Sequence, residues 1–211
     1  MACGVGDTLV EGSALLHVHG SGTPLPEDAL RRAVHLGRER TFEQDPKYPI
    51  RLLVDIAIKA LSPAINDPTT AVQTIDQLED LLRRLGAAEL DAGYAVDESG
   101  ALRLVFPTPT WEDYLRLAFD EIRHFGSSSV QVMRRMRSAL VGLVDALPSQ
   151  ERVETVRRYL KHLDCVIGAS PFDVEDKRMA RHIVAAHSET SAEPRSEGAP
   201  GGRLSRPDTD A

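Results

Sequence analysis

Polar side chains gather in the connector ALSPAINDPTTA, residues 60–71, which lies between two apolar helical patterns. One interpretation is a ligand pocket, because carboxylate, amide and hydroxyl groups can bind a small polar molecule together. The pocket would take further polar groups from the preceding helix and from the segment before it. The six residues predicted to line it are Arg40, Asp45, Asp55, Ser62, Asn66 and Asp67. This interpretation gives a metal- or small-ligand-dependent enzyme centred on Asp55, Asn66 and Asp67.

A structural interpretation explains the same connector. Asp67 is a good helix N-cap and is followed by Pro68 at the first helical position. Ser62 and Asn66 can bond to amides of their own loop. The two interpretations differ in whether an open polar cavity remains around these side chains, and the sequence leaves both open.

The carboxylate of Asp55 needs a partner or a raised pKa, because its helix is apolar over most of its circumference. Arg51 and Lys59 lie four residues away on either side, which favours an ion pair. A hard cation is a weaker alternative that would need converging oxygens. Its ligands would be Asp55, Asn66, Asp67 and Asp76. We expect no metal and no cofactor.

Other patterns favour surface roles. His17 and His19 would share one strand face, but no third ligand is spaced to help them, so we expect surface histidines. The basic runs RRMR (134–137) and RRYLKH (157–162) fall on polar helix faces, where solvent exposure is the default and an anionic membrane surface the alternative. No catalytic triad, nucleophile elbow, phosphate-binding glycine loop or HExxH motif occurs, so we name no catalytic residue.

The elements that would position these residues are mainly helices. Apolar residues recur at helical spacing, and capping residues or glycines bound several of the segments. Helices are expected at about 27–40, 50–61, 68–85, 111–125, 129–147, 150–167 and 174–186. The helix that starts at Ile50 carries a second apolar stripe of Leu52, Ile56 and Ala60, so we place it at the centre of a bundle.

Two short β pieces complete the predicted fold. Residues 5–19 are typical of short strands joined by tight turns, and 94–96 and 102–106 flank a DESG turn as a hairpin. The predicted fold class is therefore mainly α, a helical bundle with a small N-terminal β unit and one β-hairpin. The predicted domains are a truncated β unit at 1–22, a helical domain at 23–187 with the hairpin at 93–106, and a disordered tail at 188–211.

Composition excludes some classes of protein. A net charge of −7 argues against nucleic-acid binding, which usually needs a surplus of lysine and arginine. Only Cys3 and Cys165 occur, which suits a reducing compartment better than a disulfide framework. No secretory signal is visible, and no apolar run approaches the roughly 18–20 residues of a spanning helix. We therefore expect a soluble, cytoplasmic polypeptide.

Three stretches carry a resemblance to a known family: RTFEQD (40–45), RLLVDIAIKALSPAINDPTTAVQTIDQLEDLL (51–82) and WEDYLRLAFDEIR (111–123). The chain resembles the bacterial predicted membrane protein family called domain of unknown function 2254. GDTLVEGSALLHV (6–18) is similar to that family's G-x-x-V-x-x-G-x-x-L segment, so the resemblance covers residues 5–186.

The resemblance implies a partner and a location. Members of the family typically carry several transmembrane helices ahead of this region, so it implies a membrane domain as partner and an inner-membrane association for a full-length protein. This chain lacks those helices and is expected to be a detached, fragmentary or late-started cytoplasmic portion. The leading hypothesis is a non-catalytic sensory or coupling module, and assembly into a homo-oligomer is left open. The family supplies no established activity.

Overall fold

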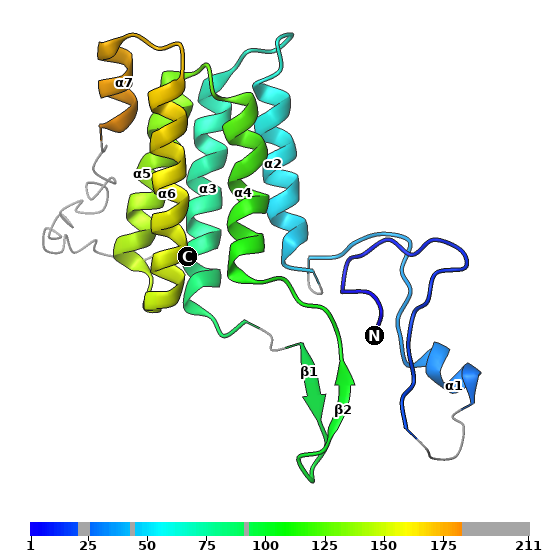
Figure 1. The fold of residues 1–211 in the computed structure, drawn as a ribbon. Coiled ribbons are helices and arrows are strands. Elements are labelled where there is room, and N and C mark those ends of the chain that lie inside the picture. The colour runs from blue at the N-terminus through cyan, green and yellow to red at the C-terminus, as the bar shows by residue number, and fades with distance from the viewer. Residues whose placement is uncertain (21–25, 43–44, 91–92, 183–211) are drawn as a thin grey trace, which may run out of the picture.

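The computed structural model describes residues 1–20, 26–42, 45–90 and 93–182. Figure 1 shows helices over most of this length and one antiparallel hairpin. In chain order the elements are α1 (Glu27–Arg32), α2 (Lys47–Ala60), α3 (Pro68–Ala87), β1 (Tyr94–Val96), β2 (Leu102–Val105), α4 (Trp111–Phe125), α5 (Val130–Ala146), α6 (Gln150–Ala169) and α7 (Val174–Arg181). The predicted mainly α fold is confirmed. The predicted tail at 188–211 and residues 183–186 of the last expected helix lie outside the described residues.

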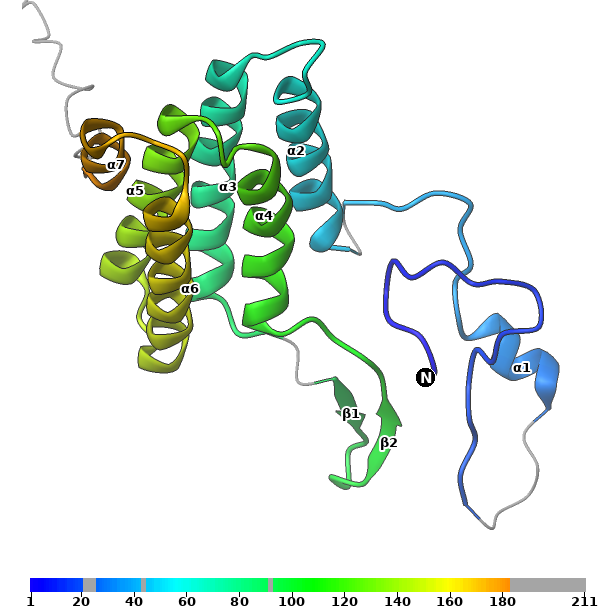
Figure 2. The same cartoon turned by 45° about the horizontal axis from the view of Figure 1, so that its top comes forward.

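Helices α2 to α7 run alternately up and down in two layers. α2, α3, α5 and α7 form one row, and α4 and α6 lie against that row (Figures 1 and 2). The start of α2, the end of α3 and the start of α4 therefore lie at the same end of the bundle, which we call the hairpin end. The connector between α2 and α3, residues 61–67, lies at the opposite end.

Side-chain caps determine where several helices begin. The Asp67 carboxylate accepts hydrogen bonds from the first-turn amides of α3, and Thr110 and Asp113 form a reciprocal capping box at the start of α4. The hydroxyls of Ser129 and Ser149 accept amide hydrogen bonds at the starts of α5 and α6. These caps confirm the helix starts that the sequence predicted.

The apolar core lies between α3, α4 and α5, with α2 and α6 completing it. Its largest fully buried side chains include Phe119, Ile75, Leu78 and Leu140. The predicted central position of α2 is wrong. Ala60 is buried as expected, but Leu52 is 36% exposed and Ile56 is 50% exposed. The reason is the position of α2 at the end of its row, where α3 and α4 cover one of its apolar stripes and only the Ala60 end of the other.

The N-terminal segment, residues 1–20, contains no strand, which corrects the β unit predicted at 5–19. The tight turns expected there do form, with positive φ angles of 81° at Gly6 and 85° at Gly12. The helix expected over 27–40 ends at Arg32. It buries no residue, so packing gives it little of the stabilisation that a short helix needs.

Arginines of the RRMR run join helices, which corrects their predicted solvent exposure. Arg135 on α5 pairs with Asp76 and with Glu79 of α3, and the Glu79 side chain is only 10% exposed. Arg137 donates from Nε to Asp164 of α6 at 2.8 Å. In the second basic run, Arg157 and Arg158 are exposed, as predicted.

Arg152 of α6 holds the two points where the hairpin leaves and rejoins the bundle. Its guanidinium donates to the carbonyl oxygens of Gly86 at 2.7 Å and of Ala88 at 2.8 Å, at the end of α3. The same group lies 5.9 Å from the ring centroid of Trp111, the first residue of α4. The Trp111 indole N–H in turn donates to the backbone carbonyl of Arg152 at 3.2 Å.

None of the described helices is long and apolar enough to span a bilayer.

Candidate functional site

The structure places the six predicted pocket residues at two ends and on one side of α2. Asp45 lies two residues before the first residue of α2, at the hairpin end, and Arg40 contacts it there. Ser62, Asn66 and Asp67 follow the helix at the opposite end. A helix of 14 residues spans about 21 Å, so the two groups are far apart. The structure therefore brings together Arg40 with Asp45, and Asn66 with its loop neighbours, but not all six residues.

The residues at the 61–67 connector have structural partners. The Ser62 hydroxyl donates to the Lys59 carbonyl oxygen at 2.7 Å, and Asn66 adopts a positive φ of 48° that turns the chain into α3. The Asp67 carboxylate accepts from the Thr70 hydroxyl and from the amides of Thr69 and Thr70, and these bonds lower its pKa. The capping interpretation of Asp67 is confirmed.

Asp55 is paired, as its spacing predicted. Its carboxylate accepts from Arg51, four residues earlier, at 2.5 Å. Arg51 also pairs with Glu121 of α4, which ties the exposed side of α2 to its neighbour. The Asp55 side chain remains 48% exposed, so it lies on the surface and not in a cavity.

Asp45 is a buried carboxylate at the hairpin end. It is 2% exposed and accepts from Arg40 Nε at 2.8 Å, while its other oxygen accepts from the Lys47 amide at 3.0 Å. Gly6 of the N-terminal segment lies directly against it, because a Cβ at Gly6 would be only 2.6 Å from Asp45 Cγ. The bonds to Arg40 and Lys47 compensate the cost of burying this charge.

The N-terminal segment covers a pocket beside Asp45. Lys47 Nζ lies 3.6 Å from an Asp7 carboxylate oxygen, and the Met1 amino group donates to the Val105 carbonyl oxygen. The pocket has a volume of about 250 Å³, and its walls come from the N-terminal segment, the start of α2 and the chain between β2 and α4. The three segments meet at the hairpin end in both views of the ribbon (Figures 1 and 2).

Tyr114 lies in this pocket with its hydroxyl unbonded. The residue is 3% exposed, and no group in the described part of the chain hydrogen bonds to its hydroxyl. Burial raises the pKa of the phenol, and the charges of Asp45 and Asp113 raise it further, so the group stays protonated and can donate.

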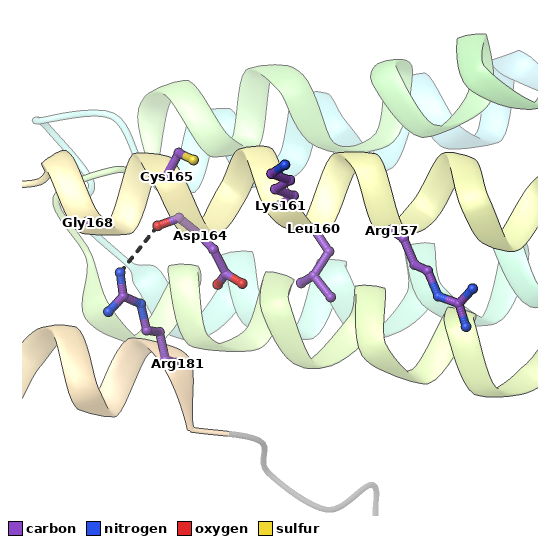
Figure 3. Close-up of a pocket in the computed structure, with 7 residues that line it drawn as sticks. All are labelled: Arg157, Leu160, Lys161, Asp164, Cys165, Gly168 and Arg181. Carbon is purple, nitrogen blue, oxygen red and sulfur yellow. Dashed lines mark hydrogen bonds between the residues drawn. The ribbon is translucent and has the colours of Figure 1, made fainter.

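A second pocket lies along α6 near the end of α7 (Figure 3). Arg157, Leu160 and Asp164 point to one side of α6, and Arg181 reaches across from α7 to the Asp164 carbonyl oxygen at 3.4 Å. Most of the lining residues are exposed, and Arg137 already pairs with the Asp164 carboxylate. This pocket is therefore a surface groove whose only acidic group is neutralised.

One face of the hairpin is apolar and exposed. Tyr94 lies opposite Val105, and beyond an irregularity in the register between Ala95 and Val96, Val96 lies opposite Leu102. This shift places the four side chains on one face, which we call the hairpin face. Each of the four is more than half exposed. The turn at its tip is acidic, and there the Asp97 carboxylate accepts from Ser99, from Arg103 and from the Ala101 amide, which lowers its pKa to about 2.

No group of three or more His, Cys, Asp or Glu side chains among the described residues is arranged to hold a metal ion. His17 and His19 are both exposed, as predicted.

Sequence reasoning identified Arg40 and Asp45 but missed Asp7, Lys47 and Tyr114. These residues lie far apart in the chain and meet only through the packing of the N-terminal segment on the bundle. The sequence signal that could have pointed to them is the position of Asp7 and Tyr114 inside two of the stretches that carry the family resemblance.

Comparisons with known proteins agree with that resemblance. The model of the family described as "Predicted membrane protein (DUF2254)" matches residues 1–141. Uncharacterised proteins of Mycobacterium tuberculosis strain H37Rv and of Mycobacterium bovis are each 37% identical over 137 residues, which is 65% of this chain and 25% of the relative. The chain thus spans about a quarter of the length of these relatives. No solved structure gives a significant match.

Proposed function

The chain belongs to the predicted membrane protein family DUF2254, whose matched relatives are uncharacterised proteins. We propose that it is a non-catalytic coupling module that docks through its hairpin end onto the membrane-embedded part of a protein of this family. The single observation that carries the proposal is the hairpin face. It presents four large apolar side chains to solvent on one short hairpin, whereas most of the large apolar side chains of the helices lie in the core.

An exposed apolar face of this kind is typical of an interaction surface. The hairpin has only two strands, and an isolated two-stranded hairpin is marginally stable in water, so a partner that covers it would also stabilise it. Asp97 and Glu98 at the tip would be repelled by anionic lipid headgroups, which favours a protein partner over direct insertion into the bilayer. The length of the relatives supports this, since three quarters of each lies outside the matched region.

A cytoplasmic location is part of the proposal. Cys3 and Cys165 are free thiols, which suits a reducing compartment. The contacts of Asp55 and Asp67 support structural roles for these carboxylates, an ion pair and a helix cap. The rival enzyme centred on Asp55, Asn66 and Asp67 therefore has no observation in its favour.

The proposal is tested by binding in trans. The purified chain is titrated onto the Mycobacterium tuberculosis relative from which the matched 137 residues have been removed, reconstituted in nanodiscs. Leu102→Asp puts a charge on the hairpin face, and Ile56→Asp puts the same charge on the exposed side of α2. We expect Leu102→Asp to weaken binding at least tenfold and Ile56→Asp to leave it unchanged.

Both variants replace side chains that are at least half exposed, so both should fold, which circular dichroism checks. The absence of binding by the wild-type chain, or equal binding by Leu102→Asp and the wild type, would refute docking through the hairpin face.

A further inference from the structure

The pocket beside Asp45 has the size of a site for a small molecule. Its volume of about 250 Å³ is below the roughly 300–1,000 Å³ of pockets that hold drug-sized ligands. It lies between the N-terminal segment and the bundle, and charged and apolar groups line it at different places. The ligand that it fits is therefore small and must satisfy both kinds of wall.

The Tyr114 hydroxyl has no hydrogen-bond partner among the described residues. Polar groups with little exposure are usually hydrogen bonded, either to the protein or to a molecule beside them. Tyr114 is 3% exposed and lines the pocket, and none of the described residues accepts a hydrogen bond from its hydroxyl. A ligand atom that accepts a hydrogen bond would complete it.

Opposite charges stand side by side in the same pocket. Lys47 Nζ and the Asp7 carboxylate are 3.6 Å apart, longer than the roughly 2.7–2.9 Å of a strong charged hydrogen bond. Asp7 is held in place by the Gly4 amide, which donates to it at 2.8 Å. The charge of Asp45 is already balanced by Arg40. Among its described residues the pocket thus holds one long ion pair, Lys47 with Asp7, which a ligand that carries both charges can exchange for contacts of its own.

The remaining wall is apolar. Leu90, Phe106 and Pro109 line it and are all partly buried. A ligand with one hydrocarbon or aromatic side chain could bury it against these residues, which is the main source of affinity in small-molecule sites.

We propose that this pocket binds a small zwitterion with an apolar side chain, of the class of the branched and aromatic α-amino acids. The ligand carboxylate is bound by Lys47 and by the Tyr114 hydroxyl, the ligand ammonium group by Asp7, and the side chain by the apolar wall. This inference rests on the pocket alone and does not depend on docking through the hairpin face.

The test uses the full chain and the twenty amino acids one at a time. Thermal-shift measurements at millimolar concentration should show stabilisation by leucine, isoleucine, phenylalanine or their close relatives and none by polar amino acids. Calorimetry then compares leucine with 3-methylbutylamine, which lacks the carboxylate, and with 4-methylpentanoate, which lacks the ammonium group. Each analogue should bind at least tenfold more weakly than leucine, because each leaves one charged group of the pocket unpaired.

Tyr114→Phe separates a binding role from a structural one. Because the hydroxyl has no protein partner, the variant should melt at the wild-type temperature without ligand, yet bind leucine about 3- to 10-fold more weakly. Tyr94→Phe removes an exposed hydroxyl from the hairpin face and should change neither quantity. The proposal is overturned if no apolar amino acid stabilises the chain, if either analogue binds as well as leucine, or if Tyr114→Phe binds leucine like the wild type.

Discussion

Substituting Gly6 by alanine tests how the N-terminal segment is attached to the bundle. Gly6 has a φ of 81°, and a Cβ placed on it would lie 2.6 Å from Asp45 Cγ and 3.2 Å from a terminal nitrogen of Arg40. Gly12 provides a matched control. Its φ is 85°, but a Cβ there would meet nothing within 4 Å. The two variants therefore share a backbone penalty and differ in the clash with Asp45.

The expected sizes follow from these contacts. A non-glycine residue in the left-handed region costs about 1–2 kcal/mol, which is the whole effect expected at Gly12. At Gly6 the Asp45 carboxylate would also have to move, although it is 2% exposed and bonded to Arg40 and to the Lys47 amide. Lifting the N-terminal segment costs less than breaking those bonds, so the segment should detach while the bundle stays folded. We expect Gly6→Ala to destabilise the segment by about 1–2 kcal/mol more than Gly12→Ala.

Hydrogen exchange measured by mass spectrometry checks this prediction. The Ala2 amide bonds to the Leu15 carbonyl oxygen and the Ser13 amide to that of Val10, so exchange in residues 1–15 reports the attachment. A difference of 1–2 kcal/mol corresponds to exchange about 5- to 30-fold faster in Gly6→Ala than in Gly12→Ala. Peptides from α3 and α5 should be unchanged. Equal exchange rates in the two variants would refute the close approach of Gly6 to Asp45.

Three further predictions concern the bundle. Thr110→Ala removes the capping box of α4 and should lower the free energy of unfolding in urea by about 1 kcal/mol, whereas no loss would show that the cap is dispensable. Phe119→Ala empties a fully buried site and should lower it by about 3–5 kcal/mol, and a loss below 1 kcal/mol would contradict the core described above. The Thr110 amide, and after it the Thr110 hydroxyl, donate to the Asp113 carboxylate and hold its pKa below 3.8. The stability that ionised Asp113 contributes is therefore fully present above pH 3.8 and is lost as the pH falls through the lower pKa of the folded protein. Stability measured from pH 5 to 2 should therefore fall less steeply in Thr110→Ala, and identical slopes would contradict the assignment.

The sequence predicts local structure well because caps and turns depend on neighbouring residues. Asp67, Thr110 and Ser149 bond to amides only two or three positions ahead, so their spacing is enough to predict the helix starts. The burial of α2 depends instead on the number of helices that surround it. Its two apolar stripes look alike in the sequence, and only the packing shows that Leu52 and Ile56 face outward.

The part of the candidate site that the sequence predicted also depends on residues that are close together in the chain. Arg40 and Asp45 are five residues apart and form an ion pair that their spacing permits. The pocket itself joins Asp7, Lys47 and Tyr114, which are 40 and 67 positions apart in sequence order and meet through tertiary packing. The predicted grouping of Asp45 with Asp67 failed to allow for the length of the helix between them.

Arg152 closes the bundle beneath the hairpin, because it binds the end of α3 and stacks over the first residue of α4. The segment between those two points is an excursion that leaves and returns at nearly the same place. A change in the length of this segment would therefore leave the register of every helix as it is. Because Arg152 holds both ends of this segment, substitutions within it can leave the packing of the helices unchanged.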